Sequence, residues 1–404
     1  PIRYHLAEDT IDNGDVDALI GWLKTYPHLT MGELTLRFEA KWSRWLGAKH
    51  SLFCNSGSSA NLLMYYSLLL SGHLKNQKVI VPAVGWATSL APAIQLGFEP
   101  ILCEADRDTY GLDLACLERL LMKHKPGTVL MVQVLGVPHK MEELMRLKRR
   151  FGFFLLEDAC AAAGAAYRGR KVGTFGDMAS FSAFFGHQFS TIEGGLVSTH
   201  DKGFLDLLRM LRSHGWSRDL DRTAHERLVR KYRIDDFHSP FVFYHPGFNF
   251  RPTHLQAFLG LRQVDKLDRM VRRRQENHAR YISNLSGKLS FQSQPDGSTA
   301  CSISFGALAA DREERRRIVR ALEENGIETR IFSAGNLGLH PFWYERHGRA
   351  SFPMADRIHH CGFFLPNNPS LSIKTIDWIS HIVLDSIRHR RPRSRMSRRA
   401  GFSP

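Results

Sequence analysis

The stretch KVIVPAVGWATSLAPAIQLGFEPILCEAD, residues 78–106, sets the plan of this chain. It alternates an apolar strand pattern, a helical pattern and a second apolar strand pattern. Strands that alternate with helices pair in parallel, and the helices then cover both faces of the sheet. The stretch therefore predicts an α/β protein built on a mostly parallel sheet.

The same plan continues on both sides of this stretch. Upstream, SLFCNSGSSANLLMYYSLLLSG (51–72) predicts a strand, a Gly-Ser turn and a helix starting near Ala60. Downstream, Gly127–Leu135 predicts a strand and Glu142–Gly152 a helix, and FFLLEDACAAAG (153–164) contains the next strand. These units indicate one large domain.

Later segments show other patterns. The polar stretch from Trp216 to Phe237 is expected to be a loop, and a long amphipathic helix is expected from about Thr253. Its basic run, Arg272 to Arg274, is interpreted as a solvated face. Shorter elements after residue 285 predict a smaller α/β domain. The expected divisions are a large domain at 1–260, a small C-terminal domain at 261–387 and a basic disordered tail at 388–404.

Composition excludes several classes of protein. Of the 404 residues, 43% are hydrophobic and 24% are charged, as in soluble enzymes. No run approaches the roughly 18 apolar residues of a membrane span, and the first residues lack a signal-peptide pattern, so we expect a cytoplasmic protein without membrane association. The six cysteines are far apart with no CxxC pair, which argues against a metal site.

The net charge of +15 is concentrated at one end. Seven arginines lie between Arg388 and Arg399, and removing their charges from +15 leaves +8. A tail rich in charge, Pro and Ser has little to bury, so it is interpreted as a solvated end rather than a nucleic-acid-binding segment. The remaining positive charge suits a substrate that carries a diphosphate.

A polar break interrupts the apolar segment SFSAFFGHQFSTIEGGLVST, residues 180–199, with His187 at its centre. We interpret this break as the floor of an active site. Ligands of parallel sheets bind at the carboxyl ends of the strands. The Gly-Ser-Ser turn, Trp86, Asp158 and His187 all follow such ends, so one crevice is expected to hold them.

Three of these features suggest a cofactor. Ser58 and Ser59 in a turn before a helix predict a phosphate site or, equally, a helix cap. Trp86 suits stacking on a flat ring or plain packing, and Asp158 is either a buried acid or a surface carboxylate. Together, a phosphate turn, a flat aromatic and a buried acid match pyridoxal 5'-phosphate, whose ring nitrogen an acid keeps protonated.

Several motifs in series resemble the DegT/DnrJ/StrS-type nucleotide-sugar aminotransferases. The resemblance runs from about Leu29 to Ile387 and is carried by the quoted turn, VPAVGWATSLAPAIQLGFEP, LLEDAC, GTFGDMASFS, the Glu-Gly-Gly segment and GFNFRPTHLQAFLGL. It implies the aspartate-aminotransferase (type I) fold and a homodimer with shared active sites.

The resemblance also implies roles for individual residues. The cofactor phosphate would be bound by Gly57, Ser58, Ser59 and Ser182. Trp86 would stack on the cofactor ring, and Asp158 would face the ring nitrogen. Asn249 would reach the cofactor phosphate of the neighbouring subunit. Around TRIFSAGNL it implies a substrate or glutamate pocket; the residues expected there are Glu193, Arg330, Asn336 and His340.

One position departs from the family pattern. Family aminotransferases carry a lysine that links covalently to the cofactor, six residues before the Glu of Glu-Gly-Gly. Here that position, counted back from Glu193, is His187, and no lysine occurs between Lys171 and Lys202. The cofactor is therefore expected to be held non-covalently, as pyridoxamine phosphate.

A histidine at this position resembles the branch of sugar 3-dehydratases in this family. That branch implies removal of the 3-hydroxyl of a nucleotide-linked 4-keto-6-deoxy sugar, with His187 as the base and L-glutamate regenerating the cofactor amine. An iron–sulfur branch also has the histidine, but no cysteine lies between Cys160 and Cys301 to hold a cluster. The alternatives are a slow aminotransferase and a non-catalytic sugar-nucleotide-binding protein; the nucleotide and sugar stay open.

Overall fold

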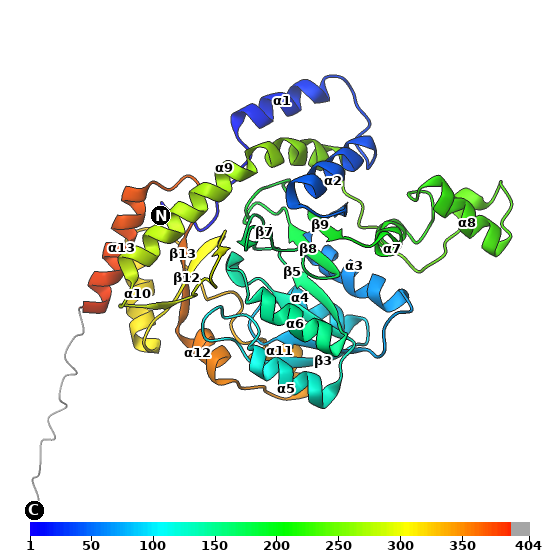
Figure 1. Ribbon diagram of the computed structural model, residues 1–404. Helices are drawn as coiled ribbons and strands as arrows, with labels where there is room; N and C mark the ends of the chain where they lie inside the picture. Colours follow the sequence, from blue (N-terminus) through cyan, green and yellow to red (C-terminus); the bar gives the residue numbers. More distant parts are fainter. Residues whose placement is uncertain (389–404) are drawn as a thin grey trace, which may run out of the picture.

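The computed structural model describes residues 1–388 and has a seven-stranded sheet at its centre (Figure 1). The strands lie in the order β1 (His50–Cys54), β9 (Gly195–Thr199), β8 (Met178–Ser182), β5 (Phe154–Asp158), β4 (Thr128–Val132), β2 (Lys78–Pro82) and β3 (Glu99–Cys103). The neighbours from β8 to β3 are parallel, whereas β9 runs antiparallel to both of its neighbours. The prediction of a mostly parallel sheet is confirmed.

Helices cover both faces of this sheet because both sets of alternating strand residues are apolar. Leu52, Val81 and Leu130 face one helical layer: α3 (Gly57–Leu70), α4 (Ala87–Gln95) and α7 (Lys202–Arg212). Phe53 and Leu155 face the opposite layer: α2 (Glu33–Leu46), α5 (Leu114–His124), α6 (Met141–Phe151) and the first part of α9 (His254–Leu285).

A second, smaller sheet lies beside the first and is covered by the end of α9 (Figure 1). It consists of β10 (Ser290–Phe291), β12 (Ser304–Leu308) and β13 (Gly362–Pro366), packed on α10 (Arg312–Glu324) and α13 (Ile373–Arg388). The chain's first residues also join this unit, because the amide of Tyr4 donates to the carbonyl of Gly326 at 3.1 Å.

The long helix α9 links the two units. It begins, as predicted, after Thr253, whose hydroxyl and the side chain of Gln256 form a capping box. The remaining elements are α1 (Asn13–Leu23), α8 (Arg222–Tyr232), α11 (Pro341–His347), α12 (Pro353–Cys361), the 3-10 turns η1 (Val134–Gly136), η2 (Ser239–Phe241) and η3 (Leu337–Leu339), and a small sheet of β6 (Ala166–Tyr167), β7 (Arg170–Lys171) and β11 (Ser298–Thr299).

The prediction of a loop from Trp216 to Phe237 is wrong. The segment contains helix α8, which extends away from the sheet (Figure 1). Asp221 caps its first turn by accepting from the amide of Ala224. No residue of α8 is buried, and its mostly polar composition concealed the helical spacing of Ala224, Leu228 and Tyr232.

The predicted basic tail lies almost wholly outside the described residues, and only Arg388 belongs to α13. Within residues 1–388, none of the helices combines the length and apolar character needed to cross a membrane.

A buried ion pair joins α2, β1 and α7. Arg212 Nη1 donates to Glu39 Oε1 at 2.7 Å and to the carbonyl of Phe53 at 2.7 Å. We expect Arg212→Leu to lower the free energy of unfolding by about 3–5 kcal/mol, because it leaves a buried carboxylate without its cation. Denaturant titration measures the change.

Lys202→Leu on the same helix is the matched control. Lys202 pairs with Asp206 and Asp221 at the surface, so its loss is expected to cost less than about 1 kcal/mol. Equal losses in the two variants would contradict this account of the core.

Candidate active site

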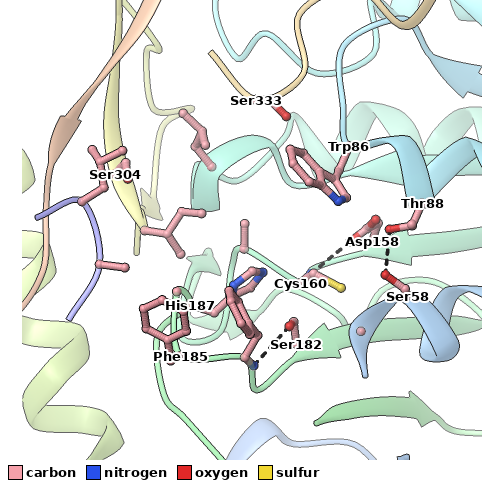
Figure 2. Close-up of a pocket in the computed structure, with 18 of the residues that line it drawn as sticks. Ser58, Trp86, Thr88, Asp158, Cys160, Ser182, Phe185, His187, Ser304 and Ser333 are labelled. Carbon is pink, nitrogen blue, oxygen red and sulfur yellow. Dashed lines mark hydrogen bonds between the residues drawn. The ribbon is translucent and has the colours of Figure 1, made fainter. Parts of the chain in front are cut away.

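The carboxyl ends of the parallel strands converge on one cavity of about 590 Å³. Asp158 ends β5 and Ser182 ends β8, while Gly57 and Trp86 lie in the connections that follow β1 and β2. Eight of the predicted site residues line this cavity: Gly57, Ser58, Trp86, Asp158, Ser182, His187, Glu193 and Arg330. Figure 2 shows Ser58, Trp86, Asp158, Ser182 and His187 around it. The sheet topology therefore brings most of the predicted site together.

Asp158 is a buried carboxylate with only 5% of its surface exposed. Its Oδ2 accepts from Asn61 Nδ2 at 2.9 Å and from Ser89 Oγ at 2.6 Å, and Oδ1 accepts from the amide of Cys160 at 3.1 Å. These neutral donors fix the carboxylate without neutralising it. A buried anion of this kind favours a cationic partner in the cavity, such as a protonated ring nitrogen.

The turn after β1 forms an anion cradle at the start of α3. Ser56 is the helix cap, since its hydroxyl accepts from the amide of Ser59, and the Ser58 hydroxyl, which the cap does not use, donates to Thr88 Oγ1 at 3.2 Å. A methyl group on Gly57 would lie 2.8 Å from the Cβ of Ser182, so glycine permits the close approach. Free amides at a helix N-terminus and neighbouring hydroxyls suit a phosphate.

Close packing explains why the Glu-Gly-Gly motif has glycine at positions 194 and 195. A Cβ on Gly195 would lie 2.1 Å from the carbonyl oxygen of Ser56, and one on Gly194 would lie 2.3 Å from Thr191 Oγ1. Gly195 thus lets β9 pass directly against the anion cradle, whereas Gly194 makes room for Thr191 and Phe53.

His187 lies in the turn between β8 and β9, and its imidazole projects into the cavity on the side of Trp86 and Asp158 (Figure 2). Its Nδ1 is buried without a hydrogen-bond partner. Burial lowers the pKa of His187 to about 4, and the cations of Arg274 and Arg330 act in the same direction, whereas Asp158 opposes them. The imidazole is therefore neutral at pH 7 and able to accept a proton.

Trp86 and Arg330 form another wall of the cavity. Trp86 is 50% exposed, so it is not a core residue, and the guanidinium of Arg330 lies 5.2 Å from its ring centroid. Partial burial lowers the pKa of Arg330, which still remains charged at neutral pH. This wall offers a flat ring and a cation for an anionic ligand.

Four predicted residues lie outside the cavity lining. Ser59 interacts with Ser56, Asn249 is exposed and accepts from Arg251 Nε, and His340 contacts the carbonyl of Ala334. Asn336 is buried, where it donates to Ala350 and Asp356 and caps η3. Asn336 and His340 thus have hydrogen-bond partners within the protein, and their substrate contacts stay predictions.

Several residues that line or support the cavity were not predicted from the sequence. Asn61 and Ser89 hold Asp158, and the available signal was a polar side chain beside apolar residues near the start of each of two helices. The N-terminal residues His5 and Leu6, together with Glu328, line the cavity without any motif.

The interpretation of Arg272 to Arg274 as a solvated face is wrong for one of its members. Arg274 is only 1% exposed, and its Nη2 donates to the carbonyl of His187 at 3.0 Å. It sits on the buried stripe of α9, which the basic character of the run concealed.

Comparison with known families decides the relationship. The model of the DegT/DnrJ/EryC1/StrS aminotransferase family matches residues 10–384. The chain belongs to this family. The expected fold of the pyridoxal-phosphate aminotransferases is confirmed.

Particular relatives are dehydratases by name. A GDP-4-keto-6-deoxy-D-mannose 3-dehydratase from Yersinia pseudotuberculosis is 32% identical over 83% of this chain and 86% of the relative. The solved structure of the E. coli enzyme of that name, with bound hydrated PLP, has a TM-score of 0.86 at 27% identity and covers 95% of this chain and 99% of that one. A solved structure of such a dehydratase with a trapped PLP-glutamate geminal diamine has a TM-score of 0.85 at 27% identity, covering 94% of this chain and 100% of that one.

The residues present fit a pyridoxal-type cofactor. The cradle of Gly57, Ser58 and Ser182 suits its phosphate, and the buried Asp158 suits its ring nitrogen. Among the described residues, no lysine lines the cavity, so the fit is to a cofactor held without a covalent link.

Gly57→Ala tests the anion cradle. We expect this variant to bind pyridoxamine phosphate about tenfold more weakly or worse, because the added methyl group displaces α3 from Ser182 and Cys160. Absorbance titration measures the affinity.

Gly21→Ala is the control, since a methyl group there meets nothing within 4 Å. Its affinity should equal that of the wild type. A Gly57→Ala protein that binds with unchanged affinity would remove the cradle from cofactor binding.

Proposed function

We propose that this chain is a pyridoxamine-phosphate-dependent 3-dehydratase of nucleotide-linked 4-keto-6-deoxy sugars. The observation that carries the proposal is His187, which projects into a cavity that no described lysine lines. A neutral imidazole accepts and returns protons but cannot form the covalent link that family aminotransferases form through lysine.

The cofactor, when bound, supplies an amine that condenses with the substrate's keto group and a ring that withdraws electrons from it. Asp158 keeps the ring nitrogen protonated, and Asn61 and Ser89 hold Asp158 in place. His187 removes the proton that starts the elimination. The same imidazole, now protonated, can donate to the hydroxyl that leaves carbon 3.

The overall reaction balances through glutamate. Replacing the 3-hydroxyl by hydrogen is a two-electron reduction of the sugar. Oxidation of glutamate to 2-oxoglutarate with release of ammonia supplies those two electrons. The solved structure of a dehydratase with a trapped PLP-glutamate geminal diamine supports glutamate as the amine donor.

Charge and shape support a nucleotide sugar as the substrate. Arg330 places a cation at the cavity wall, and Glu328 lines the same cavity with a carboxylate suited to sugar hydroxyls. The Yersinia relative's name specifies a GDP-linked 4-keto-6-deoxymannose, which makes that sugar nucleotide the first substrate to test.

A homodimer with shared sites belongs to the proposal. Asn249 is exposed and lies outside its own chain's cavity lining, so it is available to reach the phosphate of a neighbouring subunit. The cytoplasmic location expected from the sequence also remains a prediction.

The product identifies the reaction. We expect the purified protein, given pyridoxamine phosphate, glutamate and a GDP-linked 4-keto-6-deoxy sugar, to form a product one oxygen atom lighter than the substrate, with equimolar 2-oxoglutarate and ammonia. Mass spectrometry and an ammonia assay measure these. An amino sugar as the main product would identify an aminotransferase and contradict the proposal; cofactor binding without turnover of any such sugar would favour a non-catalytic binding protein.

His187→Asn provides the matched variant, since the amide retains polarity but cannot carry the proton. Its turnover is expected to fall about 10²–10⁴-fold while cofactor affinity stays near that of the wild type. Full turnover in this variant would take the base role away from His187.

A further inference from the structure

The third arginine of the basic run on α9 lies beneath the His187 turn. Arg274 Nη2 donates to the carbonyl of His187 at 3.0 Å, while Nη1 donates to the carbonyls of Ile303 at 3.1 Å and Asn367 at 2.7 Å. Ile303 precedes β12 and Asn367 follows β13. One guanidinium therefore joins α9, the turn that carries His187 and the second sheet.

This cation is buried without an anion. Among residues 1–388, no carboxylate forms an ion pair with Arg274, and its Nε has no hydrogen-bond partner. Burial lowers the pKa of Arg274 to about 10, so the side chain stays charged at pH 7. Burying a charge without a counter-ion is unfavourable, and an apolar side chain of similar length would avoid that cost. A charge kept at this cost beside an active site points to a role in catalysis.

We propose that Arg274 is a positioning residue for His187. Its hydrogen bond to the carbonyl fixes the turn that carries the imidazole, and its constant positive charge adds to burial in disfavouring the protonated imidazole. The inference rests on the proposed function, in which His187 is the base.

Other charged groups also face His187. They are Asp158 at the end of β5 and Arg330 in the segment after α10, while Glu193 before β9 and Glu328 with its neighbour His5 line the same cavity. Of the two cations that disfavour a charged imidazole, Arg330 is exposed at the cavity wall, where a bound anion would offset its charge. Arg274 is held by carbonyls behind the turn, so its effect persists when a substrate binds.

The pKa of His187 tests the inference without requiring turnover. The full-length protein, loaded with pyridoxamine phosphate and labelled with ¹³C at histidine Cε1, is titrated by NMR, with His187→Asn assigning the signal. We expect Arg274→Met to raise the pKa of His187 by about one unit or more, because removing a cation favours the protonated imidazole. The acid limb of kcat/KM should move to higher pH with it.

Arg274→Lys separates charge from packing. Lysine keeps the charge but lacks the planar fork that reaches three carbonyls, so the pKa of His187 should stay near the wild-type value even if stability falls. Arg272→Met, an exposed neighbour on α9, should leave that pKa unchanged.

The proposal is wrong if folded Arg274→Met shows the wild-type pKa for His187. Should Arg274→Met fail to fold, Arg274→Gln replaces it, because the amide removes the charge but can still donate to a carbonyl: a rise in the pKa of His187 supports the proposal, and a pKa at the wild-type value overturns it. The NMR readout needs no substrate, so a failure of the proposed dehydratase reaction would be visible separately in the product assay.

Discussion

The site depends on Asp158, a buried carboxylate that forms no ion pair with any of residues 1–388. Asp158 ends β5 in the middle of the sheet. Its carboxylate accepts hydrogen bonds from Asn61 of α3, from Ser89 of α4 and from the backbone amide of Cys160. Neutral donors orient this charge but leave it uncompensated in a poorly solvated place. A cationic ligand would complete the arrangement, and the anion cradle at the start of α3 would hold the phosphate of such a ligand.

Two buried charges of opposite sign then bracket His187. Asp158 favours a protonated imidazole, whereas Arg274 and burial favour a neutral one, and the neutral form prevails with a pKa of about 4. Family aminotransferases have a lysine at this position that binds the cofactor covalently. This chain has His187 there, which can transfer protons but cannot form that bond. The change of one residue type therefore shifts the expected chemistry from moving an amine to removing a hydroxyl.

Much of this arrangement was predictable because it depends on strand order. Apolar strands alternating with helices predicted the parallel sheet, and the rule that ligands bind at carboxyl ends predicted the meeting of Trp86, Asp158 and His187. Helix α8 was missed because it buries nothing, and Arg274 because burial of a charged residue depends on tertiary contacts rather than local pattern. Asn336 and His340 were placed by resemblance alone, and their partners are structural.

The central claim is that this cavity holds its cofactor without a covalent bond. Incubation with an equimolar amount of pyridoxal phosphate, followed by borohydride and peptide mapping, tests it directly. The claim predicts no adduct on any peptide that lines the cavity of the wild-type protein, and a stoichiometric adduct at position 187 in His187→Lys. A stoichiometric adduct on a cavity peptide of the wild-type protein would contradict it.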